Sequence, residues 1–242
     1  MIRNSRPFLV VETGQPVPSM RRHGGFAHWI RTAAGLARGE VEVVNVQAGD
    51  APPAHGEHAG VIVSGSGAMV SDREAWSERT ADWLRDAAHG GAPLFGICYG
   101  HQLLAHALGG EVADNPRGLE MGTVDLELHP AAGEDPLFTG LPARIQAQAT
   151  HLQSVIRPPE GAIVLASSTL DDRHAFRWGE SAWGVQFHPE FSADHMRGYV
   201  RARAANLERG GQDAAAIHAA VRAAPDARRV LRRFVRRARR HA

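Results

Sequence analysis

The chain has 242 residues, of which 43% are hydrophobic and 22% charged, and its 27 basic residues nearly balance its 26 acidic ones. These values are typical of a globular protein and exclude a disordered or fibrous chain. The sequence has no run of about 18 apolar residues, which is the length that a membrane-spanning helix needs. No apolar signal-peptide segment follows the charged start at residues 1–7. The sequence therefore predicts a cytoplasmic protein without a membrane partner.

The use of three residue types limits the chemistry further. Cys98 is the single cysteine, which excludes an internal disulfide and a zinc site made of several thiolates. Every basic residue is arginine, and the absence of lysine excludes Schiff-base chemistry and a Walker A phosphate loop. His55 and His58 could suggest a metal site, but histidines in a loop rich in proline and glycine are more often solvated. We expect neither a metal ion nor a cofactor.

The first half of the chain alternates apolar β-type runs with helical patterns. The runs cover residues 8–11, 41–46, 61–63 and 93–97, and the helical patterns cover residues 26–36 and 75–88. Ser71 to Glu74 has the form of a capping box that starts the second helix, and Gly90-Gly91 ends it. This order predicts an α/β doubly wound, mostly parallel sheet with flanking helices, the flavodoxin-like architecture, whose sites lie beyond the carboxyl ends of the strands.

The second half favours antiparallel strands and then helices. Residues 124–128 alternate, residues 162–166 are nearly all apolar, and residues 175–187 indicate a hairpin that turns at Gly179. The sheet is therefore expected to be mixed. Ser192 is a plausible N-cap for a helix that ends near Glu208, and Gly210-Gly211 follows it. We predict one domain over residues 1–208 and an arginine-rich helical extension over residues 209–242.

The end of the chain predicts a basic amphipathic helix that begins at Pro225. Such a helix could bind nucleic acid or an anionic membrane, or it could pack its apolar stripe on the domain or on a second subunit and leave its arginines in solvent. The chain carries a formal net charge of only +1, and no aromatic stacking platform accompanies the arginines. We therefore expect the helix to pack its apolar stripe on protein rather than to bind nucleic acid. Packing of the stripe on a second subunit would give a homo-oligomer.

Cys98 lies between Gly96 and Gly100, where an apolar strand meets a helix. This is the cysteine form of the Gly-x-Ser-x-Gly turn, which holds its central residue in a strained conformation and needs neighbours without bulk. The following helix directs its positive N-terminal end at the sulfur and favours the thiolate. The pattern predicts that Cys98 is a nucleophile.

A base and an acid for this nucleophile stand after the predicted hairpin. His188 and Glu190 are two residues apart, so on extended backbone their side chains project to the same side, and Pro189 stiffens the backbone between them. The carboxylate can then orient the imidazole. Together with Cys98 they form the pattern of a Cys-His-Glu triad.

An acyl-transfer site also needs donors for an oxyanion. Ser64-Gly65-Ser66-Gly67 follows the run at residues 61–63 and offers backbone N–H groups, and Tyr99 offers another beside the nucleophile. These groups predict an oxyanion hole.

Taken together, these features resemble the class I (triad-type) glutamine amidotransferases, and among them free-standing proteins similar to the amidotransferase domain of GMP synthase. The likeness spans about residues 8–191 and is most specific at residues 96–105 and 184–190. It implies that Cys98 attacks the side-chain amide of glutamine, that His188 protonates the departing ammonia, and that water hydrolyses the γ-glutamyl thioester. It also implies an oxyanion hole from Tyr99 and the Ser66/Gly67 turn. The residues implied for substrate binding are Gln102, Gly65, His151, Leu152 and Gln153.

Two departures from the family pattern affect these assignments. GMP synthase usually has Ser-Gly-Gly-Pro where this chain has Ser64 to Gly67, which leaves open the N–H group that completes the oxyanion hole. Gln153 replaces the acid of a His-x-Asp-x-Val segment, so the resemblance does not carry over amino-acid recognition by that acid.

Three hypotheses for the function remain at this point. The first is a glutaminase that passes ammonia to a separate synthetase partner, because the roughly 50 residues beyond Phe191 are too few for an ATP-using synthetase domain. The second is a stand-alone γ-glutamyl peptidase with a larger leaving group. The third is a binding module that uses its arginine-rich tail while the core is idle.

Overall fold

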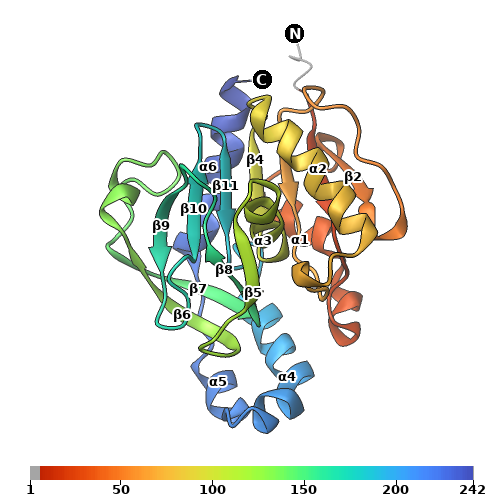
Figure 1. The fold of residues 1–242 in the computed structure, drawn as a ribbon. Helices are drawn as coiled ribbons and strands as arrows, with labels where there is room; N and C mark the ends of the chain where they lie inside the picture. Colours follow the sequence, from red (N-terminus) through yellow and green to blue (C-terminus); the bar gives the residue numbers. More distant parts are fainter. Residues whose placement is uncertain (1–5, 242) are drawn as a thin grey trace.

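The computed structural model describes residues 6–241 (Figure 1). Residues 1–5, which belong to the start that we expect to lack a signal peptide, lie outside the described residues. The strands of the central sheet, in spatial order, are β2 (Val41–Asn45), β1 (Phe8–Glu12), β3 (Gly60–Val63), β4 (Leu94–Ile97), β11 (Ala182–Val185), β10 (Ala175–Trp178), β9 (Ile163–Ser167), β6 (Glu120–Leu128) and β7 (Arg144–His151). β5 (Glu111–Asp114) and β8 (Gln153–Arg157) pair separately.

The sheet is mixed, as the sequence predicts. From β2 to β11 the strands are parallel, and from β11 to β7 each strand is antiparallel to its neighbour. The helices are α1 (Phe26–Ala34), α2 (Ala75–His89), α3 (Tyr99–Ala107), α4 (Ala193–Arg209), α5 (Ala214–Ala220) and α6 (Pro225–His241). Short 3-10 helices lie at Pro18–His23 (η1), Arg38–Glu40 (η2), Val46–Ala48 (η3), Val70–Asp72 (η4) and Pro130–Gly133 (η5).

The inner parallel strands β1, β3, β4 and β11 are almost entirely apolar because helices cover both faces of the sheet, whereas the edge strand β2 is partly exposed. In β1, Phe8 and Val10 pack in the core on the side of α1 and α6, whereas Leu9 and Val11 pack in the core on the side of α2 and α3. Successive side chains of a strand point to opposite faces, so a strand buried on both sides reads as a continuous apolar run. Figure 1 shows α2 and α3 in front of the sheet and α6 behind it.

The prediction of a capping box at Ser71 to Glu74 was wrong. Ser71 lies in η4, Arg73 follows with a positive φ of 52°, and α2 begins only at Ala75 without a side-chain cap. The N–H and hydroxyl groups of Ser71 bond instead to the side chain of Gln153. A tertiary contact has therefore replaced the local one.

The sequence analysis also missed the strands β5, β7 and β8. Strand β7 reads Arg-Ile-Gln-Ala-Gln-Ala-Thr-His and is rich in alanine and glutamine, which have a low preference for strands. It forms because β6 pairs with it over its whole length, from Arg144 opposite Glu127 to His151 opposite Glu120. Its conformation depends on this distant partner.

Helix α6 packs its apolar stripe on the domain, as we favoured. Phe234 is fully buried, and its ring contacts the rings of Phe8, Phe95 and Trp183 at centroid distances of 6.5, 5.1 and 6.3 Å. The other buried residues of the stripe are Ala227, Val230, Leu231, Val235 and Ala238. Among residues 6–241, no helix combines the length and apolarity needed to cross a bilayer.

The carboxyl ends of three neighbouring parallel strands meet at one edge of the sheet. Val63 of β3 lies opposite Gly96 of β4, and Ile97 of β4 lies opposite Val185 of β11. The residues that follow these strands are therefore brought together at that edge. This is where ligand sites form in open α/β sheets.

Candidate active site

Cys98 occupies a strained turn between β4 and α3. Its φ of 51° and ψ of −100° make it one of two non-glycine residues with positive φ in the described chain. A Cβ on Gly96 would lie 2.4 Å from the carbonyl oxygen of Gly100, and one on Gly100 would lie 2.5 Å from that of Val63. Both glycines are therefore required by close backbone packing, which the sequence predicts.

The side chains of His188 and Glu190 lie together, but the backbone is a turn rather than the extended segment that the sequence predicts, since the N–H of Phe191 donates to the carbonyl of His188 at 3.3 Å. Nδ1 of His188 is 2.8 Å from Oε1 of Glu190, and both residues are buried. The ring of Phe191 stacks on the imidazole at a centroid distance of 4.2 Å. Nε2 of His188 makes no hydrogen bond with any described residue, so it is free to exchange a proton with the thiol or a substrate.

The electrostatics of the site favour an ion pair between Cys98 and His188. Burial raises the pKa of the Cys98 thiol, but the charges of His188 and His151 outweigh burial and hold this pKa below its usual value. Burial lowers the pKa of His188, but the charges of Glu190 and Cys98 outweigh it and raise the pKa of His188 to about 10. The thiolate is the form of cysteine that attacks a carbonyl.

The loop after β3 lies against the imidazole. The N–H of Thr13 donates to Oγ of Ser64 at 3.0 Å, and the hydroxyl of Thr13 donates to the carbonyl of Gly65 at 3.1 Å, which fixes the loop. A Cβ on Gly65 would lie 3.0 Å from Cε1 of His188 and 3.7 Å from Cβ of Cys98, so Gly65 lies against both side chains. The backbone of this loop is therefore next to Cys98.

Tyr99 directs its side chain away from the sulfur. Its hydroxyl lies 2.6 Å from Oγ of Ser77, in the core between α2 and α3. Its N–H and that of Gly67 donate to no other group in the described chain, so both are available to a ligand.

A cavity of about 200 Å³ contains the sulfur and the imidazole. Its lining residues are Gln15, Pro16, Val17, Pro18, Arg21, Phe26, Ser66, Gly67, Cys98, Thr150, His188, Tyr199 and Arg203. Sequence analysis missed the residues from the segment after β1 and from α4. Gln15 to Pro18 lie just beyond the carboxyl end of β1, and this position could have indicated that they line the site. No local pattern in the sequence indicates the same for Arg203.

The residues implied for substrate binding do not line this cavity. The amide nitrogen of Gln102 donates to the carbonyl of Gln153 at 2.6 Å and to the side chain of Gln186 at 2.9 Å. The side chain of Gln153 bonds to Ser71 and Asp114, and Leu152 is 38% exposed. A role for these side chains in binding substrate stays a prediction.

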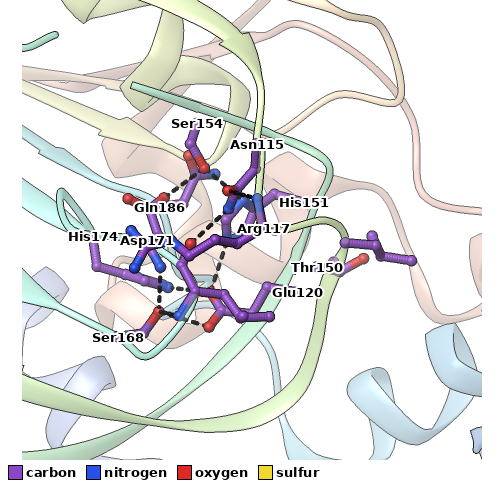
Figure 2. A network of polar contacts seen from close by, with 12 residues as sticks. Asn115, Arg117, Glu120, Thr150, His151, Ser154, Ser168, Asp171, His174 and Gln186 are labelled. Carbon is purple, nitrogen blue, oxygen red and sulfur yellow. Dashed lines mark hydrogen bonds and ion pairs between the residues drawn. The ribbon is translucent and has the colours of Figure 1, made fainter. Parts of the chain in front are cut away.

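His151 belongs to a buried polar network (Figure 2). Its Nδ1 lies 3.0 Å from the carbonyl of Gln153, and its Nε2 lies 2.9 Å from Oε2 of Glu120. The same oxygen lies 2.8 Å from Nε2 of His174, and Oε1 of Glu120 accepts a hydrogen bond from Ser168. Both nitrogens of His151 are thus occupied within the protein.

Within the described residues, Glu120, His151 and His174 are the group that could hold a metal ion, with ligand atoms within 4.8 Å of one another. The separations of 2.8 and 2.9 Å between oxygen and nitrogen are those of hydrogen bonds. Shared protons account for them without an ion.

The fold is that of the glutamine amidotransferases. A solved structure of a glutamine amidotransferase from Thermotoga maritima superposes with a TM-score of 0.76 at 19% identity, over 97% of this chain and 98% of that one. A glutamine amidotransferase from Methylobacillus flagellatus gives a TM-score of 0.72 at 22% identity, over 96% and 95% of the two chains.

A sequence model for glutamine amidotransferase class-I matches residues 22–204, and the chain belongs to this family. It is 39% identical over 133 residues to a GMP synthase [glutamine-hydrolyzing] from Aeropyrum pernix, a match that covers 54% of this chain and 24% of that protein. It is 29% identical over 163 residues to a gamma-glutamyl-L-1-hydroxyisopropylamide hydrolase from a Pseudomonas species, over 64% of this chain and 55% of that protein. The chain thus matches only part of the length of each relative.

Proposed function

We propose that this protein hydrolyses γ-glutamyl amide bonds, that of the glutamine side chain being the simplest, through a thioester on Cys98. The observation that carries the proposal is the strained, glycine-flanked Cys98 beside an imidazole that Glu190 holds at 2.8 Å. Family membership supports it, and both relatives are named for hydrolysing a glutamine or γ-glutamyl amide.

The reaction follows from the charges of the site. The thiolate of Cys98 attacks the γ-carbonyl carbon, and the S–C bond forms while the carbonyl oxygen becomes an oxyanion. The free N–H groups of Tyr99 and Gly67 are the donors that we assign to that oxyanion. His188 gives its Nε2 proton to the nitrogen, the C–N bond breaks, and the amine leaves.

Water then completes the cycle. It attacks the thioester and loses a proton to His188, the S–C bond breaks, and glutamate leaves with the thiolate restored. Glu190 stabilises the imidazolium throughout, and no cofactor is required in this scheme.

The fate of the ammonia is part of the same proposal. The name of the GMP synthase relative joins glutamine hydrolysis to a synthesis, and this chain matches only 24% of that protein. We propose that ammonia from glutamine passes to a separate synthetase chain in the cytoplasm, where a lone cysteine stays reduced. The alternative of a γ-glutamyl hydrolase with a larger leaving group is favoured by the cavity that Cys98 and His188 line.

The test measures release of glutamate and ammonia from glutamine, beside a panel of γ-glutamyl amides, for the wild type and Cys98→Ala. We expect the variant to lose about 10³-fold or more of the activity, because the covalent step needs the sulfur. Circular dichroism of the variant controls for folding. Activity that survives in Cys98→Ala, or a wild type inactive on every γ-glutamyl compound, would contradict the proposal.

A further inference from the structure

The cavity beside Cys98 is lined by two arginines and by no carboxylate among the described residues. Arg21 and Arg203 line it, none of its described lining residues is acidic, and neither arginine forms an ion pair with a described residue. Glu190, which lies behind the imidazole, is engaged with Nδ1 of His188. A guanidinium group in a cavity without a carboxylate is a binding site for an anionic group.

Arg203 is held close to the nucleophile. Its Nη1 donates to Oγ1 of Thr150 at 3.1 Å, and the carbonyl oxygen of the same threonine lies 3.9 Å from the sulfur of Cys98. Its guanidinium group also lies 5.8 Å from the centre of the Tyr199 ring, an arrangement that stabilises a cation. Arg203 is half-buried, and its remaining N–H groups are free to bind a carboxylate.

Arg21 is positioned by the packing of η1 on α4. Its Nε donates to the carbonyl of Pro16 at 3.0 Å. Met20 packs so closely on Gly198 that a Cβ there would lie 2.1 Å from its sulfur. The N–H of Val17 donates to the hydroxyl of Tyr199, which ties the same segment to α4. The two arginines thus lie on two segments that pack on each other and line one cavity.

The cavity adjoins the imidazole that protonates the leaving nitrogen in the proposed reaction, so the group attached to this nitrogen would lie next to it. Cys98, His188 and Gly67 line the cavity together with the segment after β1 and α4, whereas Gly65, Gln102 and Leu152 do not line it. Ammonia needs no such space and bears no carboxylate.

We propose that this cavity is a leaving-group subsite in which Arg203 and Arg21 bind the carboxylate of a γ-glutamyl amino acid. The inference rests on the proposed function in its alternative form, a γ-glutamyl hydrolase with a larger leaving group, and names the substrate class of that site. The overall reaction is γ-glutamyl amino acid plus water to glutamate plus a free amino acid. The C–N bond breaks, the nitrogen takes its proton from His188, and water supplies the oxygen of the new γ-carboxylate.

The first experiment compares a γ-glutamyl amino acid with its uncharged amide and with two substrates that lack the carboxylate-bearing group. The substrates are γ-glutamylalanine, γ-glutamylalaninamide, γ-glutamylisopropylamide and glutamine, and the readout is kcat/KM from glutamate release. We expect γ-glutamylalanine to be preferred over its uncharged amide by about tenfold or more, the effect of a charge-assisted hydrogen bond. Equal rates for the acid and the amide would overturn the proposal.

The second experiment changes the arginines one at a time. Arg203→Gln and Arg21→Gln are expected to reduce the preference for γ-glutamylalanine over γ-glutamylalaninamide. Matched controls are Arg201→Gln, on the exposed side of α4, and Arg22→Gln, next to Arg21, neither of which lines the cavity. An equal loss of kcat/KM on γ-glutamylalanine and on its amide would overturn the proposal. Arg203 would then bind the glutamyl part of the substrate or stabilise the fold.

Binding separates this inference from the proposed function. Calorimetry with Cys98→Ala measures binding of γ-glutamylalanine and its amide without hydrolysis. Tighter binding of the acid, lost when Arg203→Gln is added, would support the subsite even if the wild type were inactive on all four compounds. Equal binding of both, or no binding at millimolar concentration, would overturn it whatever the activity.

Discussion

The backbone of Cys98 adopts a conformation that side-chain-bearing residues seldom adopt, with φ at 51° and ψ at −100°. Such strain persists only where the surroundings enforce it, and here the close approach of Gly100 to Val63 and Gly96 enforces it. The turn places the sulfur at the N-terminus of α3 and beside His188. Both the helix end and the imidazolium stabilise a thiolate.

The reactivity of Cys98 with iodoacetamide should follow this charge arrangement. As the pH falls through the lowered pKa of Cys98, the thiolate takes up a proton and alkylation slows. As the pH rises through about 10, His188 loses its proton and the ion pair is lost. We therefore expect alkylation of the wild type to remain fast below the usual thiol pKa of about 8.5.

His188→Asn tests the cause. This variant lacks the charge of His188, which opposes the effect of burial, so the pKa of the Cys98 thiol should rise. Because one pKa unit is a factor of ten in the thiolate fraction, alkylation at pH 7 should slow by about tenfold or more. His106→Asn, in the same helix as the nucleophile turn but bonded to Glu78, is the matched control. A titration midpoint unchanged in His188→Asn would refute this account.

At the scale of elements, α6 completes the core on one face of the sheet. Its fully buried Phe234 lies among rings from β1, β4 and β11, and its arginines donate to backbone carbonyls of distant segments. Nε of Arg232 donates to Ala33 at 2.9 Å, and Nη1 of Arg233 donates to Leu137 at 3.0 Å. The stripe that could bind a membrane is therefore occupied by the protein's own core.

Phe234→Ala should destabilise the whole fold. Removing a fully buried phenylalanine costs about 3–5 kcal/mol through lost burial and the cavity left behind. Urea unfolding measures this free energy, with Arg240→Ala, an exposed residue of the same helix, as control. A loss below about 1 kcal/mol would show that α6 is an appendage rather than part of the core.

At the scale of the whole molecule, the network around Glu120 joins parts of the chain that are far apart in sequence. Glu120 is in β6, His151 ends β7, and His174 precedes β10 (Figure 2). Nδ1 of His151 faces a carbonyl, which only accepts, and its Nε2 faces a carboxylate, so both nitrogens carry protons. Burial raises the pKa of Glu120, but its hydrogen bonds to both histidines outweigh burial and hold this pKa below its usual range.

Glu120→Gln should lower the free energy of unfolding by about 3–5 kcal/mol at pH 7, because it leaves a buried imidazolium without its carboxylate. A carboxylate with a lowered pKa stabilises the fold above its unfolded pKa of about 4.3, and this stabilisation is lost as the pH falls through the folded value. The difference between variant and wild type should therefore shrink as the pH falls from about 5 to about 3.

Urea unfolding at both pH values makes this measurement. Glu127→Gln, an exposed residue of the same strand, is the control and should change stability little. A difference that stays constant with pH would mean that Glu120 acts through its shape rather than through its charge.

The sequence by itself determined the features that depend on neighbours along the chain. The turn at Cys98 needs glycines two residues away on each side, so local spacing predicts it. His188 and Glu190 are also close along the chain, although a turn from His188 to Phe191, rather than extended backbone, brings their side chains together. The alternation of apolar runs and helices likewise predicts the mixed sheet, and therefore the edge where these residues meet.

Tertiary structure alone decided the features that depend on distant partners. Ser71 bonds to Gln153 instead of capping α2, β7 forms on β6 in spite of its composition, and His151 turns into a buried network. Arg21 and Arg203 line the same cavity because their two segments pack together. One contact between these segments joins Val17 to Tyr199, which lie 182 positions apart in the sequence. Contacts of this kind arise from packing of whole elements, whose geometry no local pattern encodes.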